Sequence, residues 1–191
     1  MNIDLGKTQR FIEWLKEKIY LDAVSANAAK RRVIRGQVYR CKFGVGIGSE
    51  ENKERPCVII QNDSSNISSP NTIVAPITHT SSTLNTVVPI ADQFDSAGNL
   101  ILDGNVLTGN IVCVSKARLG NLITTLPADE MKAVDKAIAI SLNLYHYYNT
   151  KDNVCKDQEE HIKKLQEINK MSKETIDNLK KELSEANKGK V

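Results

Sequence analysis

Residues 46–63 read Gly-Ile-Gly-Ser-Glu-Glu-Asn-Lys-Glu-Arg-Pro-Cys-Val-Ile-Ile-Gln-Asn-Asp and contain the sharpest change of character in the chain. The segment begins as a glycine-rich polar stretch, which is typical of a loop, and continues from residue 57 as an apolar run, which is typical of a β-strand. Arg55 and Pro56 lie where the two meet. The sequence therefore predicts a fixed cation at the junction of a mobile loop and a rigid strand, where functional side chains often lie.

A second strand is predicted at residues 72–77, which read Thr-Ile-Val-Ala-Pro-Ile and are followed by the hydroxyl side chain of Thr78. Residues 66–70 contain asparagine, serine and proline, and this composition indicates a turn between the two strands. Strands joined by a short turn pair side by side in an antiparallel sheet. We therefore expect Arg55 and Thr78 to lie at one rim of that sheet.

Further short strands are predicted in the central region. Apolar, β-branched runs occupy residues 38–43, 86–90 and 111–114, and turns are indicated at residues 96–99 and 103–105. Closely spaced strands of this kind predict a small barrel or a strongly bent sheet.

Three helices are predicted, one after the strands and one at each end of the chain. Proline and acidic residues at 127–130 indicate a helix start, and the inner face of this helix is predicted to contain Met131, Val134, Ile138, Leu142 and Tyr145. Residues 8–30 have the apolar spacing of an amphipathic helix that lies on a surface, with Phe11, Trp14, Leu15, Ile19 and Val24 as its apolar residues. Residues 151–191 are highly charged and predict either a long solvated helix or a coiled coil with a polar middle. The seam would contain Ile162, Leu165, Asn169, Ser172, Ile176, Leu179, Leu183 and Ala186.

Three segments carry a resemblance to a known family: residues 35–39, which read Arg-Gly-Gln-Val-Tyr, residues 46–78 and residues 118–142. In these segments and in their order the chain resembles the MazF/PemK toxins, which are sequence-selective endoribonucleases of toxin–antitoxin systems. The resemblance covers residues 34–144. It implies an α+β fold built on a small, strongly bent antiparallel β-barrel of the SH3-like type with packed helices.

The domain organisation follows from the limits of this resemblance. A chain of 191 residues can form one packed domain with extensions. We predict an N-terminal helical extension at residues 1–32, an endoribonuclease domain at 33–150, and a charged C-terminal helix, a candidate coiled coil, at 151–191. Because every candidate catalytic residue lies in the central domain, both extensions are predicted to be dispensable for the chemical step.

The resemblance implies that Arg55 and Thr78 form the catalytic pair. RNA can be cut without a metal ion because its own 2′-hydroxyl can attack the adjacent phosphorus, so no metal or cofactor is expected. A guanidinium offers a planar fork of donors to phosphate oxygens, and because its pKa lies above about 12 we expect Arg55 to stabilise the phosphate rather than to transfer a proton. Thr78 is expected to hydrogen-bond a phosphate oxygen or the attacking hydroxyl. Ser49 and Glu50, in the loop expected to close over the bases, and Asn110 are the substrate-binding residues that the resemblance implies.

Simpler interpretations of the same residues stay open from the sequence. Arg55 could form a surface ion pair with Glu54 or Glu51, and Thr78 could be a β-forming residue that only closes its strand. The polar loop residues could be a solvated tip. His79 follows Thr78 and is a further candidate for the general base, because the pKa of histidine is close to neutral.

Charge is distributed unevenly along the chain. The net charge is +3, but residues 1–42 contain 10 basic and 4 acidic residues, whereas residues 43–150 contain 6 basic and 10 acidic residues. A nucleic-acid partner gains affinity from phosphate neutralisation. An RNA partner is therefore expected to depend on a local basic rim, with help from the basic cluster at residues 30–35.

Cysteine spacing and hydropathy restrict the remaining protein classes. None of the four cysteines forms a Cys-X-X-Cys pair, and three lie in strand-like runs, which favours buried free thiols over disulfides or a zinc site; the four are Cys41, Cys57, Cys113 and Cys155. The chain has no long apolar segment, and its N-terminus lacks the pattern of a signal peptide. We expect a cytoplasmic protein that does not bind membranes.

Two functions stay open. The resemblance implies a toxin that cleaves single-stranded RNA, acts as a homodimer and is neutralised by a cognate antitoxin. The alternative is a catalytically weak relative that acts as a nucleic-acid- or protein-binding regulatory module. Residues 107–113 favour the alternative, because they read Leu-Thr-Gly-Asn-Ile-Val-Cys where the family usually carries a Leu-Glu-Gln-Ile-Arg-Thr-like run. Arg55 and Thr78 favour the enzyme.

Overall fold

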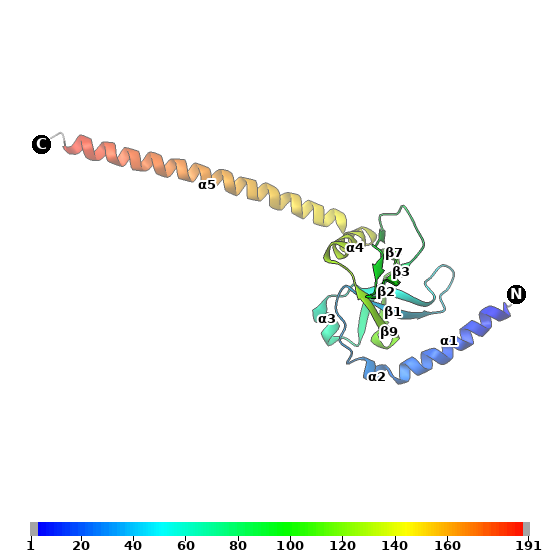
Figure 1. The fold of residues 1–191 in the computed structure, drawn as a ribbon. Helices are drawn as coiled ribbons and strands as arrows, with labels where there is room; N and C mark the ends of the chain where they lie inside the picture. The colour runs from blue at the N-terminus through cyan, green and yellow to red at the C-terminus, as the bar shows by residue number, and fades with distance from the viewer. Residues whose placement is uncertain (1–3, 189–191) are drawn as a thin grey trace. The chain divides into compact units, whose positions relative to one another are not determined.

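Strand β3 (Asn71–Thr78) holds the sheet together in the computed structural model, which describes residues 4–188 (Figure 1). One edge of β3 pairs with β2 (Lys53–Ile59), and its other edge pairs first with β8 (Val112–Ser115) and then with β7 (Asn105–Leu107). The β8 pairing ends at Val74 and the β7 pairing begins at Ile77. Backbone groups of successive residues in a strand point alternately to its two edges. Because Ile60 N donates to Ile73 O, Ile73 faces β2, and Pro76, three residues later, faces the opposite edge at the break between β8 and β7. The N–H that proline lacks therefore removes no hydrogen bond of the sheet.

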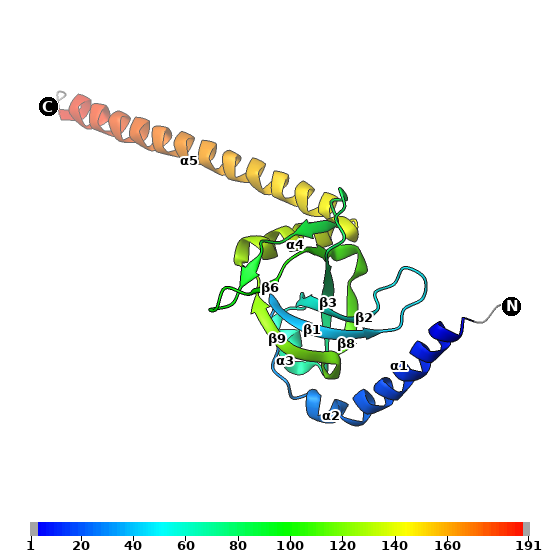
Figure 2. The same cartoon turned by 45° about the vertical axis from the view of Figure 1, so that its right-hand side comes forward.

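The other strands extend the sheet on both sides of β3 (Figure 2). Strand β1 (Gln37–Gly44) pairs with β2, β9 (Leu119–Thr125) pairs with β1, and β4 (Val87–Pro89) pairs with β7, all antiparallel. A separate hairpin, β5 (Gln93–Phe94) and β6 (Leu100–Leu102), encloses the predicted turn at residues 96–99. The predicted antiparallel sheet with packed helices is confirmed. Within residues 4–188 no pairing joins β4 to β9, so closure into a barrel stays a prediction.

The start of β2 differs from the prediction. The apolar run begins at Cys57, but the strand begins four residues earlier, at Lys53. Pairing with β1 explains the difference, because Glu54 lies opposite Lys42 and Arg55 lies opposite Cys41 in that ladder. Arg55 therefore lies within a paired strand, which restricts its backbone more than a loop would.

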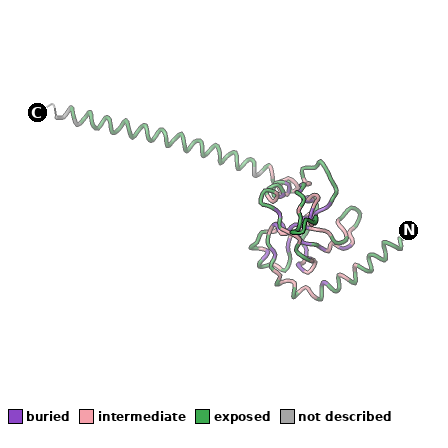
Figure 3. The backbone as a smooth tube through the Cα atoms, viewed as in Figure 1, coloured by how far each residue is buried: buried purple, intermediate pink, exposed green. Residues whose placement is uncertain are grey.

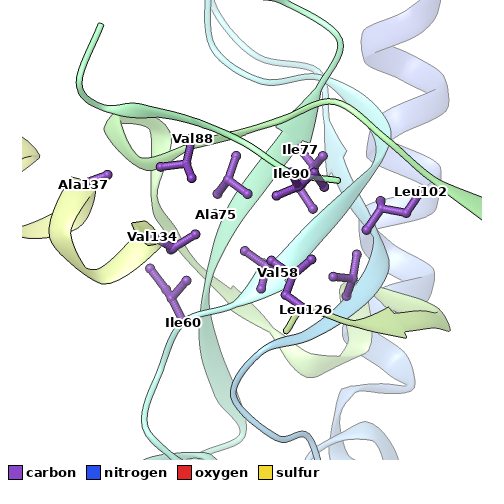
Figure 4. Close-up of a cluster of buried hydrophobic side chains, with 12 residues drawn as sticks. Val58, Ile60, Ala75, Ile77, Val88, Ile90, Leu102, Leu126, Val134 and Ala137 are labelled. Atoms are coloured by element: carbon purple, nitrogen blue, oxygen red, sulfur yellow. The ribbon is translucent and has the colours of Figure 1, made fainter. Parts of the chain in front are cut away.

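Residues 57–59 of β2 and 74–78 of β3 are buried on both faces, which explains why residues 57–60 read as a continuous apolar run. Helix α4 (Ala128–Ser141) contributes to the cluster on one face (Figure 4), which contains Val58, Ile60, Ala75, Ile77, Val88, Ile90, Leu102, Leu126, Val134 and Ala137. The cluster on the other face contains Val33, Tyr39, Cys41, Cys57, Ile59, Val74, Val114 and Leu119. The central strands are thus held from both sides, and the loops at their ends project from a rigid support.

Helix α4 begins where the proline and the acidic residues predict it. Three residues of the predicted inner face pack toward the core: Met131, Val134 and Ile138. The other two do not, because Leu142 is 52% exposed and Tyr145 belongs to the next helix. Between them Asn143 takes a φ of 55°, the left-handed conformation that commonly ends helices.

The predicted N-terminal helix is present as α1 (Leu5–Ala23) followed by the short α2 (Ser25–Ala28). The predicted apolar face is only partly buried: Trp14 and Val24 are half-buried, whereas Phe11, Leu15 and Ile19 are 41%, 57% and 64% exposed. Figure 3 shows the same exposure along most of α1. Hydrophobic burial holds the end of this helix through Leu21, and specific contacts near Trp14 hold its middle, as described below.

The C-terminal helix α5 (Tyr145–Lys188) begins six residues before the predicted position. Contacts divide the chain into two compact units, Met1–Asn143 and Leu144–Val191, so α5 belongs to the second. The apolar residues of its predicted seam are exposed (Figure 3), including Ile162, Leu165, Ile176, Leu179 and Leu183. Coiled-coil pairing of α5 stays a prediction.

All four cysteines are free thiols, as predicted, but only two are buried. Cys41 and Cys57 lie in the core, whereas Cys113 and Cys155 are exposed. The prediction of burial was wrong for Cys113, because two neighbouring residues of its edge strand β8, Val112 and Cys113, both lie at the surface. In the described part of the chain no helix has the length and apolar character needed to cross a membrane.

A buried polar network occupies the segment that the sequence predicts as a turn. Helix α3 (Asp63–Ser68) replaces the first part of that turn; it begins three residues before it and is capped by the Asn62 side chain, which accepts a hydrogen bond from Ser65 N. Asn66 is 1% exposed and is the centre of the network. Its Oδ1 accepts from Thr72 Oγ1 at 2.8 Å, its Nδ2 donates to Gln61 O at 3.0 Å, and its carbonyl accepts from Lys116 Nζ at 2.6 Å.

Lys116 is the unusual member of this network. The residue is 1% exposed, and its burial lowers the pKa of the ammonium below its ordinary value. A buried charge of this kind is costly unless hydrogen bonds satisfy it, so the carbonyl of Asn66 fixes where Lys116 can lie. The same bond ties η2 (Lys116–Arg118) to α3.

We predict that Asn66→Ala destabilises the fold by about 1–3 kcal/mol, because it leaves Thr72 Oγ1 and Gln61 O buried without a partner. The change in unfolding free energy can be measured by urea denaturation. Asn121→Ala, at an exposed position of β9, is the control and should stay within about 0.5 kcal/mol of the unmodified protein. Equal stability of the two variants would contradict a structural role for the network.

Candidate functional site

Arg55 and Thr78 meet at the rim of the sheet, as the sequence predicts. Cys57 of β2 pairs with Pro76 of β3, and Arg55 and Thr78 lie two residues beyond that pair on their own strands. Side chains two residues apart on a strand point to the same face. Arg55 Nη1 consequently lies 3.4 Å from Thr78 Oγ1, a long hydrogen bond that leaves both groups free to tighten onto a ligand.

The other side of the guanidinium is held by the loop before β2. Arg55 Nε lies 3.0 Å from Glu51 Oε2 and donates to Asn52 O at 3.2 Å. The ion pair with Glu51 was the simpler interpretation of Arg55, and it is present together with the contact to Thr78. The Arg55 side chain is 35% exposed and that of Glu51 is 14% exposed. The carboxylate thus orients a cation that stays accessible from solvent.

Thr78 is 8% exposed, and its hydroxyl is fixed by its neighbours. Thr80 N donates to Thr78 Oγ1 at 3.3 Å, and Thr80 Oγ1 lies 3.3 Å from the same oxygen. Gly104 makes the close approach of the next strand possible: its φ is +106°, and a Cβ at this position would lie 2.6 Å from Thr78 O. Thr78 is therefore held by its own strand and by the turn that precedes β7.

The three predicted substrate-binding residues line one cavity. This cavity, of about 640 Å³, lies between the β1–β2 loop and the segment formed by η1 (Thr108–Asn110) and β8, and Ser49, Glu50 and Asn110 all border it. Its size is within the range of about 300–1,000 Å³ that is usual for ligand pockets. Glu50 Oε2 also accepts from Ile47 N at 2.9 Å, which shapes the loop.

Glu51 connects this cavity to the Arg55–Thr78 pair. One carboxylate oxygen faces Arg55, and the other accepts from Asn110 Nδ2 at 3.3 Å. Sequence reasoning assigned Glu51 only as an alternative ion-pair partner and missed this bridging position. In the sequence Glu51 lies four residues before Arg55, but this spacing alone does not indicate a contact. The path of the loop before β2 brings the two side chains together.

Arg118 is a second residue of the candidate site that the sequence did not single out. It borders the cavity from the end of η2, and its Nη1 donates to Phe43 O at 3.3 Å. The cavity therefore has a cation on one wall and the carboxylates of Glu50 and Glu51 on another. A ligand with both phosphates and base edges, which carry donors and acceptors, suits this pattern.

Other candidate groups do not join this arrangement. His79 is highly exposed and its Nδ1 lies 3.2 Å from Asp103 Oδ2; its role as a general base stays a prediction. A hydrogen bond with Cys41, together with burial, raises the pKa of the Cys57 thiol well above its ordinary value, so Cys57 is not a nucleophile. Within the described residues no cluster of three or more His, Cys, Asp or Glu side chains has the geometry to hold a metal ion.

Comparison with known proteins matches the central part of the chain. Endoribonuclease EndoA of Bacillus subtilis (strain 168) is 35% identical over 116 residues, which are 60% of this chain and 98% of EndoA. An endoribonuclease in complex with its cognate antitoxin from Mycobacterial species has a TM-score of 0.50 and 28% identity, covering 59% of this chain and 96% of that one. MazF from Deinococcus radiodurans has a TM-score of 0.52 at 17% identity, with 59% and 98% covered, and shows similarity of fold alone.

A family model matches more than half of this chain, and this extent decides the family assignment. The model of the PemK-like, MazF-like toxins of type II toxin–antitoxin systems matches residues 34–142, which are more than half of the chain and include β1, both strands of the site, the cavity and α4. This chain therefore belongs to the PemK-like, MazF-like toxin family.

Proposed function

We propose that this protein is the toxin of a type II toxin–antitoxin system and that it cleaves single-stranded RNA, in particular mRNA, as a metal-independent, sequence-selective endoribonuclease. The observation that carries the proposal is the guanidinium of Arg55 beside the hydroxyl of Thr78 at the rim of the sheet, next to a cavity with mixed charge. Similarity to an endoribonuclease over nearly the whole length of that relative supports the same activity.

In the proposed mechanism the RNA supplies its own nucleophile. The 2′-hydroxyl oxygen attacks the adjacent phosphorus and loses its proton, the bond from phosphorus to the 5′-oxygen breaks, and that oxygen gains a proton. The products are a cyclic phosphate, which can open to a 3′-phosphate, and a 5′-hydroxyl end. Arg55 stabilises the charge on the phosphate in the transition state, and Thr78 donates to a phosphate oxygen or orients the attacking hydroxyl.

The cavity is proposed to receive the bases next to the cleaved phosphate. Ser49 and Glu50 would contact them from the loop, and Asn110 from the opposite wall. Glu51 would position the catalytic cation, because its carboxylate holds Arg55 Nε at 3.0 Å. Binding of RNA can pull Asn110 away from Glu51, since the hydrogen bond between them is long at 3.3 Å.

A regulatory binding module is the second candidate, and one observation favours it. In the segment where the sequence departs from the family run, Val112 is 39% exposed and Cys113 is exposed, so an apolar surface lies beside the cavity. A purified protein that binds RNA but cuts none of it in the presence of a chelator would support this function over the enzyme.

Partners and organisation are proposed on the same basis. A solved relative is an endoribonuclease in complex with its cognate antitoxin, and we infer that this protein also has a cognate antitoxin. We further infer that it is a homodimer. It is proposed to act in the cytoplasm, where translated mRNA is found. The domain limits proposed from the sequence are retained, with α5 as a candidate coiled coil. The three partners of the single strand β3 support a strongly bent, barrel-like sheet.

We predict that Arg55→Ala lowers cleavage by about 100-fold or more, because charge stabilisation directed at the transition state has effects of that size. The assay is the initial rate on a long single-stranded RNA with chelator present. Unfolding free energy should change by no more than about 1 kcal/mol, since the ion pair with Glu51 is partly exposed.

Arg55→Lys is the matched control, because it keeps the charge but not the planar fork of donors. Its rate should fall between those of the unmodified protein and Arg55→Ala. A folded Arg55→Ala protein that cleaves at the unmodified rate would show that the proposed mechanism is wrong.

For Thr78, replacement by valine keeps the shape and removes the hydroxyl. We expect Thr78→Val to lower kcat by about 10-fold or more while RNA affinity falls less, because the hydroxyl acts mainly on the reacting phosphate. Thr78→Ser keeps the hydroxyl and should retain most of the activity. If valine and serine variants cleave equally fast, Thr78 has only a structural role.

The proposed homodimer can be tested by sedimentation velocity at low micromolar concentration. Proteins with residues 151–191 intact and removed should both sediment as dimers, because the paired surface is placed in the central domain. A monomer in both cases would contradict the dimer. A dimer that depends on residues 151–191 would move the interface to α5.

A further inference from the structure

The N-terminal helix makes one specific contact with the strand that leads into the functional loop. Trp14, the only tryptophan of the chain, packs with its indole ring on Gly44, the last residue of β1. A Cβ at residue 44 would lie 2.1 Å from Trp14 Cε2, and Gly44 has a φ of +90°. Only glycine can therefore occupy this position beneath the ring.

The same ring lies beside the cation of the candidate cavity. The guanidinium carbon of Arg118 is 5.3 Å from the centroid of the Trp14 ring, within the range of a cation–π contact. Arg118 also donates to Phe43 O and borders the cavity. Trp14 thus contacts both the base of the β1–β2 loop and a residue on the wall of the proposed substrate site.

A salt bridge fixes this part of α1 on β1. Glu17, three residues after Trp14, pairs with Lys42, two residues before Gly44, and this hydrogen bond raises the pKa of the Lys42 ammonium. Trp14 and Glu17 are three residues apart, so one face of α1 makes both contacts with the end of β1. In Figures 1 and 2, α1 lies on the side of the sheet from which the β1–β2 loop projects.

We propose that Trp14 is a positioning residue for the RNA site: it orients the Arg118 guanidinium toward the cavity and fixes the hinge of the β1–β2 loop that carries Ser49, Glu50 and Glu51. The inference rests on the proposed function of that site. Trp14 lies outside the family match, which begins at residue 34, so the extension adds a contact to a site built by the family domain. The ligand is a single strand of RNA whose phosphate Arg118 receives.

The first test measures RNA affinity in full-length proteins that carry Arg55→Ala, so that the RNA stays intact. A fluorophore-labelled single-stranded oligonucleotide is titrated and its anisotropy recorded. Trp14→Ala should weaken binding by about 2- to 5-fold, the size expected for an exposed cation–π contact, and Trp14→Phe should weaken it less. Ile12→Ala, on the same helix and 58% exposed, is the control and should bind as the parent does.

A double-mutant comparison separates positioning from a general structural effect. If Trp14 acts through Arg118, then Trp14→Ala should cause little further loss of affinity in a protein that already carries Arg118→Met. In proteins with Arg55 intact, Trp14→Ala should raise KM and leave kcat within about twofold. Full additivity of the two changes, or a loss confined to kcat, would overturn the proposal.

The single tryptophan provides a direct readout. In the Arg55→Ala protein, binding of the unlabelled oligonucleotide should change the intensity or wavelength of Trp14 emission, and Arg118→Met should reduce this change at saturating RNA. RNA that binds without any change in emission, together with unaltered affinity of Trp14→Phe, would overturn the proposal. These spectra need no folded Trp14→Ala protein, so the test holds even if that variant does not fold.

The failures of the two proposals can be told apart. If the unmodified protein cleaves RNA and Trp14→Ala binds it as tightly as Ile12→Ala does, the positioning role is wrong and the endoribonuclease stands. If the unmodified protein neither cleaves nor binds RNA, both proposals are overturned.

Discussion

The register between β2 and β3 is the constraint on which the site depends. Cys57 lies opposite Pro76, and this pairing alone decides that Arg55 and Thr78 point to the same face at the end of their strands. A shift of one residue would turn the side chains of one strand to the other face and separate the guanidinium from the hydroxyl. Burial of alternate residues in two clusters on opposite faces makes that shift costly. The core therefore stabilises the site as much as the fold.

Glu51 places a negative charge at the centre of the proposed RNA site, although RNA is itself negatively charged. The carboxylate holds Arg55 from one side and Asn110 from the other, so it restricts two residues on different segments. Its charge also opposes that of a phosphate. The Glu51–Arg55 ion pair fixes the orientation of the guanidinium but partly neutralises its charge. Affinity for RNA phosphates must therefore come from other cations. Arg118, on the cavity wall, is one of them.

The sequence predicted the parts of the fold that are set by local patterns. The apolar run of β2 from Cys57, the position of β3, the start of α4 and the helical ends of the chain all follow from composition and spacing. The start of β2 at Lys53, the helix α3 around Asn66 and the exposure of Cys113 could not be predicted, because pairing with distant residues and a buried hydrogen-bond network decide them. Likewise Ser49, Glu50 and Asn110 were predicted one by one, whereas the Glu51 and Trp14 contacts depend on tertiary structure.

The break along the edge of β3 has a further consequence. Beyond Pro76, the partner of β3 changes from β8 to β7, so Thr78 is supported by the β4–β7 pair, whereas Arg55 is supported by β1. The two residues of the proposed catalytic pair thus have different supporting strands on their outer sides, although β2 and β3 pair with each other as far as Cys57 and Pro76. The distance between the Arg55 guanidinium and the Thr78 hydroxyl therefore depends on how these strands pack. Substitutions in β4 or β7 can change that distance, and with it the proposed turnover, without replacing a residue of the site. If the proposed pair is catalytic, evolution can adjust the activity by this route while every residue that borders the cavity stays unchanged.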